Sequence, residues 1–106
     1  MSNERFWHHL EKAESTLIRD QIIFGEYERL VVQDLHTING FIEDIHLALD
    51  NSEITPQRLQ HLLNLETDAL RERNRLNSDL KMVRSIIAEN NADVTMIEAL
   101  LKARFT

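Results

Sequence analysis

Apolar residues in the first half of the chain recur at spacings of three and four positions. The run comprises Phe6, Leu10, Ala13, Leu17, Phe24, Tyr27, Val31, Leu35, Ile38, Ile42, Ile45 and Leu49. This spacing places the apolar side chains along one face of a helix, and it is typical of a helix pair or coiled coil rather than of a β-strand.

Two glycines and one proline interrupt this pattern. Gly25 either ends a first helix over 3–24 and starts a second over 26–50, or kinks one long helix. Asn39-Gly40 is normally a turn signal, but the apolar phase continues through it, so we predict that the helix continues. The clear break comes before Pro56, where Thr55 is suited to cap a helix that has Pro56 at its first position.

The second half of the chain predicts a helix over 55–90 and a short final helix over 93–105. The longer helix carries Leu59, Leu62, Leu65, Ala69, Leu76, Leu80, Val83 and Ile87, with a second, offset edge at Leu63, Leu70, Asn77 and Arg84. Asn90-Asn91 is expected to end it, and the final helix carries Val94, Ile97, Leu100, Leu101 and Phe105. Together these patterns predict one all-α domain over 1–106, an antiparallel helical bundle or coiled coil of three to four helices.

Composition and charge narrow the classes of partner. The 106 residues include no cysteine and have a net charge of −6, concentrated between Glu26 and Glu53. An acidic chain disfavours nucleic acid, because lysine and arginine supply the affinity for phosphate. No apolar run approaches the roughly 20 residues that cross a bilayer, and the N-terminus has no secretory pattern. We therefore expect no nucleic-acid partner, no membrane insertion and a cytoplasmic location.

The sequence contains no strong motif for metal binding or catalysis. Glu43-x-x-His46 has the spacing of a di-metal carboxylate motif, but such sites need a second copy and two further glutamates. The serines lack a nucleophile elbow, and no glycine-rich phosphate loop is present. A chorismate-mutase-like helical enzyme is the remaining catalytic alternative, with its cationic site recruited from Arg5, Lys12, Arg19 and Arg29. The sequence thus predicts no catalytic residues, no metal, no cofactor and no enzyme activity.

Two segments resemble a known family. The stretch from Phe24 to Gln33 (FGEYERLVVQ) is similar to the first helical junction of flagellar type III export chaperones of the FliT/FlgN class. The stretch from Leu70 to Leu80 (LRERNRLNSDL) resembles the late helix on the FlgN side, where asparagines three apart precede an aliphatic run. The similarity in pattern covers most of residues 5–90, whereas the compact segment beyond residue 90 is closer to the FliT side.

The resemblance implies a cytosolic chaperone that binds the amphipathic C-terminal helical region of a flagellar cap or hook-associated protein. Such a chaperone keeps its client unassembled and delivers it to the export gate or ATPase. An amphipathic helix lying in an apolar groove is a common mode of recognition. We predict a client-binding edge formed by Leu63, Leu70, Asn74, Asn77 and Leu80. Val94, Ile97 and Leu101 are predicted to form a covering helix over it.

A generic helical adaptor or a self-associating coiled-coil protein is the alternative to an export chaperone. Heptad patterns are shared by all helical bundles, and a homodimer would bury the same apolar edges. The sequence does not specify the client or the oligomeric state. It also does not decide between a kink and a hairpin at Gly25.

Overall fold

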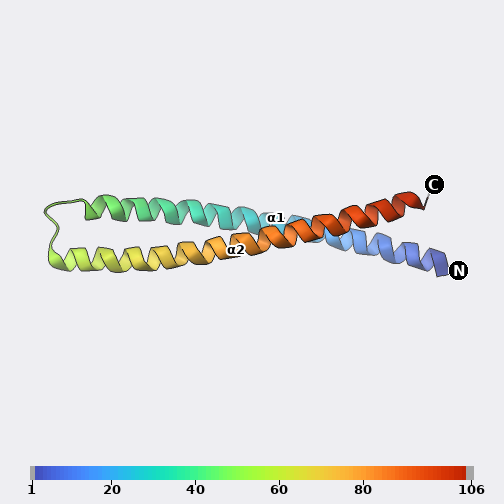
Figure 1. The fold of residues 1–106 in the computed structure, drawn as a ribbon, viewed down its shortest axis with the longest axis horizontal. Helices are drawn as coiled ribbons and strands as arrows, with labels where there is room; N and C mark the ends of the chain where they lie inside the picture. The colour runs from blue at the N-terminus through green and yellow to red at the C-terminus, as the bar shows by residue number, and fades with distance from the viewer. Residues whose placement is uncertain (1, 105–106) are drawn as a thin grey trace. The chain divides into compact units, whose positions relative to one another are not determined.

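The computed structural model describes residues 2–104 as two helices, α1 (Ser2–Leu49) and α2 (Pro56–Ala103), each of 48 residues (Figure 1). The predicted all-α class is confirmed. The described part of the chain has two long helices instead of the predicted three or four. The predicted end of the last helix, with Phe105, lies outside the described residues.

The break between the helices lies where the sequence predicted it. α1 ends at Leu49, and in the loop the Asn51 side chain accepts a hydrogen bond of 3.0 Å from the backbone N–H of Glu53. Thr55 Oγ1 accepts the backbone N–H of Arg58 at 3.2 Å, which is the bond of an N-cap residue to the third helical position. Pro56 then takes the first helical position, where its missing N–H costs nothing.

Of the two alternatives at Gly25, the one with separate helices over 3–24 and 26–50 is wrong. α1 continues through both glycines, neither of which has a positive φ. A glycine in a helix interior costs only about 1 kcal/mol relative to alanine. The apolar spacing continues from Phe24 to Val31 across Gly25, so packing against α2 on both sides of the glycine outweighs this cost.

The helix boundary predicted at Asn90-Asn91 is also wrong, and here side chains supply the reason. Asn90 is buried, and its Nδ2 donates a 2.9 Å hydrogen bond to the backbone carbonyl of Leu17. The exposed Asn91 accepts a hydrogen bond from Gln21 Nε2. Both asparagines therefore bond across to α1 rather than capping a helix end, and α2 runs on to Ala103.

The chain divides into two compact units, each formed by one stretch of either helix. The loop unit is Arg29–Lys81, in which α1 and α2 run antiparallel from the connecting loop (Figure 1). Its core contains Ile42, Ile45, Leu62 and Ala69, with Ile38, Leu49, Leu65 and Leu70 among the partly buried residues packed against them. On its surface, His46 Nε2 lies 2.6 Å from Glu66 Oε2.

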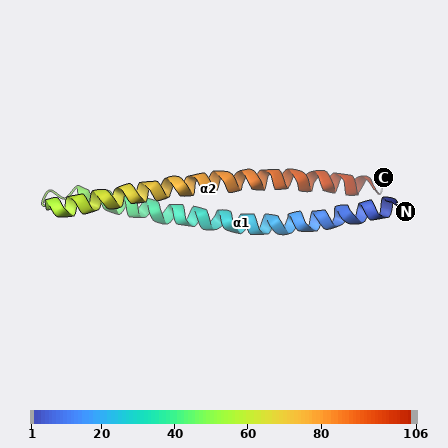
Figure 2. The same ribbon diagram turned by 90° about the horizontal axis from the view of Figure 1, so that it is seen from below.

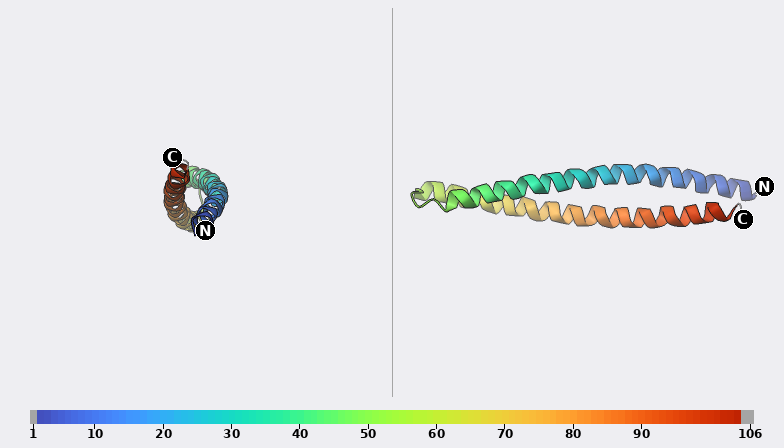
Figure 3. Two further views of the ribbon diagram at one scale, coloured as in Figure 1. Left: turned by 90° about the vertical axis from the view of Figure 1, so that its right-hand side faces the viewer. Right: turned by 90° about the horizontal axis from the view of Figure 1, so that it is seen from above.

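The terminal unit contains Met1–Glu28 and Met82–Thr106, described over 2–28 and 82–104. Its two helical stretches lie side by side and antiparallel (Figures 2 and 3). Val83, Val94 and Ile97 are buried in it together with the polar Asn90. Towards the chain ends, the Arg104 guanidinium lies 5.6 Å from the centre of the Trp7 ring and 3.1 Å from Glu11, which links the two helices there.

Candidate helix-binding groove

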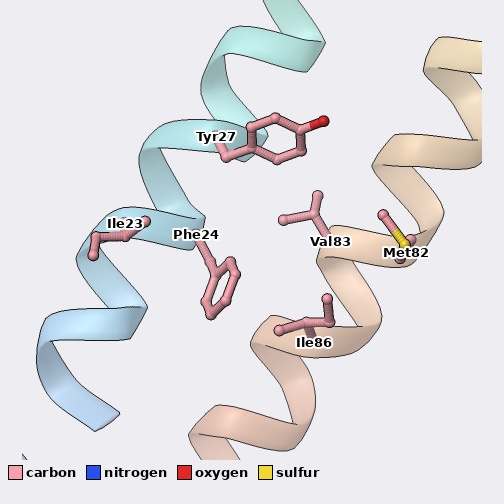
Figure 4. A pocket seen from close by; sticks show the side chains of 6 residues that line it. All are labelled: Ile23, Phe24, Tyr27, Met82, Val83 and Ile86. Carbon is pink, nitrogen blue, oxygen red and sulfur yellow. The ribbon is translucent and has the colours of Figure 1, made fainter. Parts of the chain in front are cut away.

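An apolar groove lies on one side of the terminal unit, between α1 and α2. It has a volume of ≈ 290 Å³ and is lined by Ile23, Phe24, Tyr27, Met82, Val83 and Ile86. In Figure 4, Phe24 and Tyr27 project from α1 towards Val83 and Ile86 on α2. The lining offers carbon, the Met82 sulfur and one tyrosine hydroxyl, so its chemical capacity is to bury apolar side chains.

The groove exists because neighbouring apolar residues on each helix point in different directions. Successive helical residues are about 100° apart, so consecutive apolar side chains cannot all face one partner helix. On α1, Phe24 is partly buried towards α2 while Ile23 is 56% exposed at the rim. On α2, Val83 is only 1% exposed while Met82 is 55% exposed. Each helix thus contributes one residue to the floor and another to the rim.

Polar bridges follow the other side of the same helix pair. Arg84 Nε donates to Glu28 Oε2 at 2.9 Å, and Gln21 bonds to Asn91. Arg84 lies two positions after the groove residue Met82, so the two side chains point about 200° apart, and Asn91, seven residues after Arg84, shares its edge. The terminal unit therefore has one flank linked by polar side chains and one flank that is apolar and open.

One titratable group among the described residues has a resolved pKa shift. The Arg75 guanidinium donates hydrogen bonds to Glu72 and lowers the pKa of that exposed carboxyl, within the loop unit. Among residues 2–104, no three His, Asp or Glu side chains gather closely enough to hold a metal ion. Over the same residues, neither helix contains a stretch apolar enough to cross a bilayer. The groove is the candidate binding site among the described residues.

No protein-family model matches this chain, and no curated protein or solved structure shows a significant similarity to it.

The residues predicted to form the client-binding edge lie on α2 in the loop unit. Leu63, Asn74 and Asn77 are exposed, as a binding role requires. Leu70 packs against the core of the loop unit, and Leu80 is partly buried. Part of the edge thus belongs to the intramolecular core, and a client-binding role for these five residues stays a prediction.

The residues predicted to form a covering helix lie on α2 itself. Val94 and Ile97 are buried in the terminal unit, and Leu101 is partly buried there. Because α2 is one continuous helix, this segment cannot fold back over residues 63–80 of the same helix. A separate covering helix is therefore absent from the described residues, and these side chains form part of the contact between α1 and α2.

Sequence reasoning missed Ile23, Met82 and Ile86 as candidate binding residues. Ile23 is the middle residue of Ile22-Ile23-Phe24, an apolar run too wide for one neighbouring helix. Met82 and Ile86 lie next to core positions of α2 but outside its main apolar stripe. Apolar residues flanking a heptad stripe on both helices are the signal that predicts such a groove.

Proposed function

We propose that this chain is a helix-binding protein of the export-chaperone type, which holds an amphipathic helix of a client protein in the groove of its terminal unit. The observation that carries the proposal is an apolar cleft whose rim residues Ile23 and Met82 are both more than half exposed. An amphipathic helix presents apolar side chains at spacings of three and four, which suits insertion between two antiparallel helices.

The total accessible surface of the chain supports binding of a partner. The chain exposes 8144 Å² of accessible surface. A compact monomer of 12.5 kDa exposes about 6,200 Å² by the usual scaling with mass. The difference of about 2,000 Å² exceeds the roughly 800 Å² that one partner contributes to a standard protein interface.

Large hydrophobic side chains are among those left exposed. Among the described residues, nine hydrophobic residues are buried, whereas 14 large hydrophobic residues are substantially exposed. Where such side chains lie together, as they do at the groove, exposed apolar surface marks interaction sites in natural proteins. Exposure of apolar residues on both units favours a protein that completes its packing with a second molecule.

The client class comes from the sequence resemblance. The segments that resemble FliT/FlgN chaperones imply a client among flagellar cap and hook-associated proteins, bound through its C-terminal helical region. Holding that helix in the groove would cover the apolar surface that the client uses for assembly. The chaperone would thereby keep the client soluble and unassembled until it reaches the export apparatus.

Co-expression with C-terminal segments of cap and hook-associated proteins tests the proposal. We expect one such segment to co-purify at a fixed stoichiometry, measured by size-exclusion chromatography with light scattering. The double variant Ile23→Gln/Met82→Gln should lose the complex, because both rim side chains become polar while glutamine preserves helix propensity. Leu63→Gln on the predicted client-binding edge is the matched control and should retain it.

The outcomes separate the two candidate surfaces. Loss of the complex in Leu63→Gln, with retention in the groove variant, would move the binding site to the edge at 63–80. Failure of every such segment to bind would refute the assignment to flagellar clients.

A self-associating coiled-coil protein is the second candidate. Ile18 and Ile22 are exposed on α1 and do not line the groove, so apolar side chains are also exposed elsewhere on the terminal unit. Sedimentation equilibrium of the isolated chain distinguishes the candidates. A stable dimer that persists in Ile23→Gln/Met82→Gln and dissociates in Ile18→Gln/Ile22→Gln would support self-association through Ile18 and Ile22.

A further inference from the structure

Most of the large hydrophobic side chains that the terminal unit exposes lie on its groove side. Helix positions seven residues apart share a face in a coiled coil. Steps of seven from Tyr27, Met82 and Ile86 towards the chain ends therefore continue the edges that line the groove. Six of the eight exposed large hydrophobic residues in the described part of this unit lie in the groove or on these edges, and they define the groove face: Phe6, Ile23, Tyr27, Met82, Met96 and Leu100.

The groove face is wider than a single helix. From Phe6 to Tyr27 α1 rises about 31 Å, and from Met82 to Leu100 α2 rises about 27 Å. Two packed helices are together about 20 Å wide, so the face measures about 600 Å² in projection. This is of the order of the roughly 800 Å² that one partner contributes to a standard interface. One helix, about 10 Å across, would cover about half of this width, whereas a second helix pair would cover all of it.

The accessible surface of the chain is also large enough for a homodimer. Each chain exposes 8144 Å², which is about 2,000 Å² more than a compact monomer of its mass. Two copies together therefore have about 4,000 Å² available for burial. Obligate homodimers bury about 2,000–5,000 Å² in total, so this amount lies within the range that a stable dimer needs.

Charged residues of opposite sign flank the groove face on its two helices. The edge of α1 beside Ile23 carries three exposed bases seven residues apart: Arg5, Lys12 and Arg19. Asp20 and Glu26 add two acids to this side of α1, which keeps an excess of bases towards the chain end. On α2 the charged residues of the groove side are the exposed acids Glu89 and Asp93, seven residues from Met82 and Ile86.

We propose that two copies of the chain associate through this face, groove against groove, in a contact with two-fold symmetry. The inference goes beyond the proposed function, because the contact needs no client. The two-fold axis runs parallel to the helices, so α1 of each copy packs against α2 of the other. This orientation sets the basic edge of α1 against the acidic edge of α2. An axis across the helices would pair like helices and like charges, which opposes association.

Bonds within the terminal unit indicate which charged residues would meet. Gln21 on α1 is bonded to Asn91 on α2, so these two residues mark one level along the helix pair. Because the helices are antiparallel, Arg19 and Asp93 both lie two residues beyond this level towards the chain ends. A two-fold axis parallel to the helices preserves levels, so Arg19 of one copy would lie opposite Asp93 of the other, twice in the dimer.

The dimer would cover the groove when no client is present. A client helix and a second copy would then compete for the same rim residues, Ile23 and Met82. The net charge of −6 on each copy opposes association at long range, but salt at physiological strength screens this repulsion beyond about 8 Å. Burial of the groove face and the Arg19–Asp93 contacts act at shorter distances.

Sedimentation equilibrium of the full chain at physiological salt tests the inference. We expect a dimer that Ile23→Gln/Met82→Gln weakens by roughly 100-fold or more, because two-fold symmetry removes each rim anchor twice. Ile18→Gln/Ile22→Gln is the matched control, since these exposed residues of α1 do not line the groove. It should change the dissociation constant less than about twofold. Circular dichroism should show equal helix content in both variants.

A charge swap tests the orientation of the two copies. Arg19→Glu or Asp93→Lys alone should weaken the dimer by about 5- to 30-fold, because each places like charges together at two symmetric contacts. The double variant Arg19→Glu/Asp93→Lys should return to within about threefold of the wild type. Arg71→Glu changes the net charge as much as Arg19→Glu at an exposed site of the loop unit, and it should have less than about a twofold effect.

The outcomes separate this inference from the proposed function. A chain that stays monomeric, or a dimer that persists in Ile23→Gln/Met82→Gln, would overturn the inference and leave client binding untouched. A double charge variant no tighter than its single variants would overturn the proposed orientation. A client segment that binds should convert the dimer to a complex with one copy of the chain, and retention of two copies would overturn competition for the groove. If no segment binds, the proposed function fails while the dimer result stands.

Discussion

Replacing Asn90 by aspartate would test whether the polar residue in the core of the terminal unit is held by its bond to α1. Asn90 is 7% exposed, and its side-chain nitrogen donates to the Leu17 carbonyl at 2.9 Å. Asn90→Asp preserves the shape of the side chain but replaces the donor by a carboxylate oxygen. That oxygen would face a carbonyl oxygen in a site with little access to water.

Two effects set the size of the stability loss expected for Asn90→Asp. The hydrogen bond itself contributes about 0.5–1.5 kcal/mol, and leaving the buried Leu17 carbonyl without a donor costs about 1–3 kcal/mol more. We therefore expect Asn90→Asp to lower the free energy of unfolding by about 2–4 kcal/mol at pH 7. This loss is large against the 5–15 kcal/mol by which domains are typically stable.

The loss should depend on pH with a definite sign. Burial raises the pKa of the introduced carboxyl in the folded state above its unfolded value of about 3.9. A group with a raised folded pKa contributes stability that is present below the unfolded pKa and lost as pH rises through the folded pKa. Once protonated, it donates an O–H to Leu17. The deficit relative to the wild type should thus shrink to about 1 kcal/mol or less near pH 4.

Urea unfolding followed by circular dichroism, at pH 4 and pH 7, measures this effect. Hydrogen exchange of the amides in 82–104 assigns it to the terminal unit. Asn91→Asp is the matched control, because Asn91 is exposed and its side chain accepts a bond from Gln21, which a carboxylate can also do. Equal stability of the two variants at pH 7 would refute the assignment of Asn90 as a buried donor.

Three further substitutions test the helices themselves. Gly25→Ala should raise the free energy of unfolding by about 0.5–1 kcal/mol, because the backbone is helical there and an added Cβ meets nothing within 4 Å. A decrease would show that Gly25 leaves the helical conformation in solution. Thr55→Ala should lower it by about 0.5–2 kcal/mol through loss of the N-cap bond, and Thr55→Ser should largely preserve it. Val83→Ala should cost about 1.5–3 kcal/mol in the same unfolding assay, because the side chain is fully buried, whereas Ser85→Ala at an exposed position should stay within about 0.5 kcal/mol.

Local sequence signals predicted the features that depend on neighbouring residues. The start of α2 is an example, because Thr55 and Pro56 act within one turn of helix. The apolar spacing across Gly40 likewise predicted an uninterrupted helix, which α1 confirms. In both cases the interactions that decide the outcome lie within a few residues of each other.

Features that depend on contacts with the opposite helix could not be predicted from the sequence. Asn90 and Asn91 have the composition of a helix end, but their partners Leu17 and Gln21 lie about 70 positions earlier in the chain. The groove was missed for the same reason, since Ile23 becomes a rim residue only when Met82 is placed across from it. Predicting either feature requires the register between α1 and α2, which the spacing of apolar residues within one helix does not specify.

The placement of the polar bridges has a mechanical consequence for the terminal unit. Glu28–Arg84 and Gln21–Asn91 connect the helices along the edge away from the groove. If these bonds act as a hinge, α1 and α2 can rotate apart on the groove side by a small angle while their register is kept. A bound helix with bulkier side chains would then widen the cleft without sliding one helix along the other. Under the proposed function, the groove would hold helices of unequal size while presenting each of them in the same orientation.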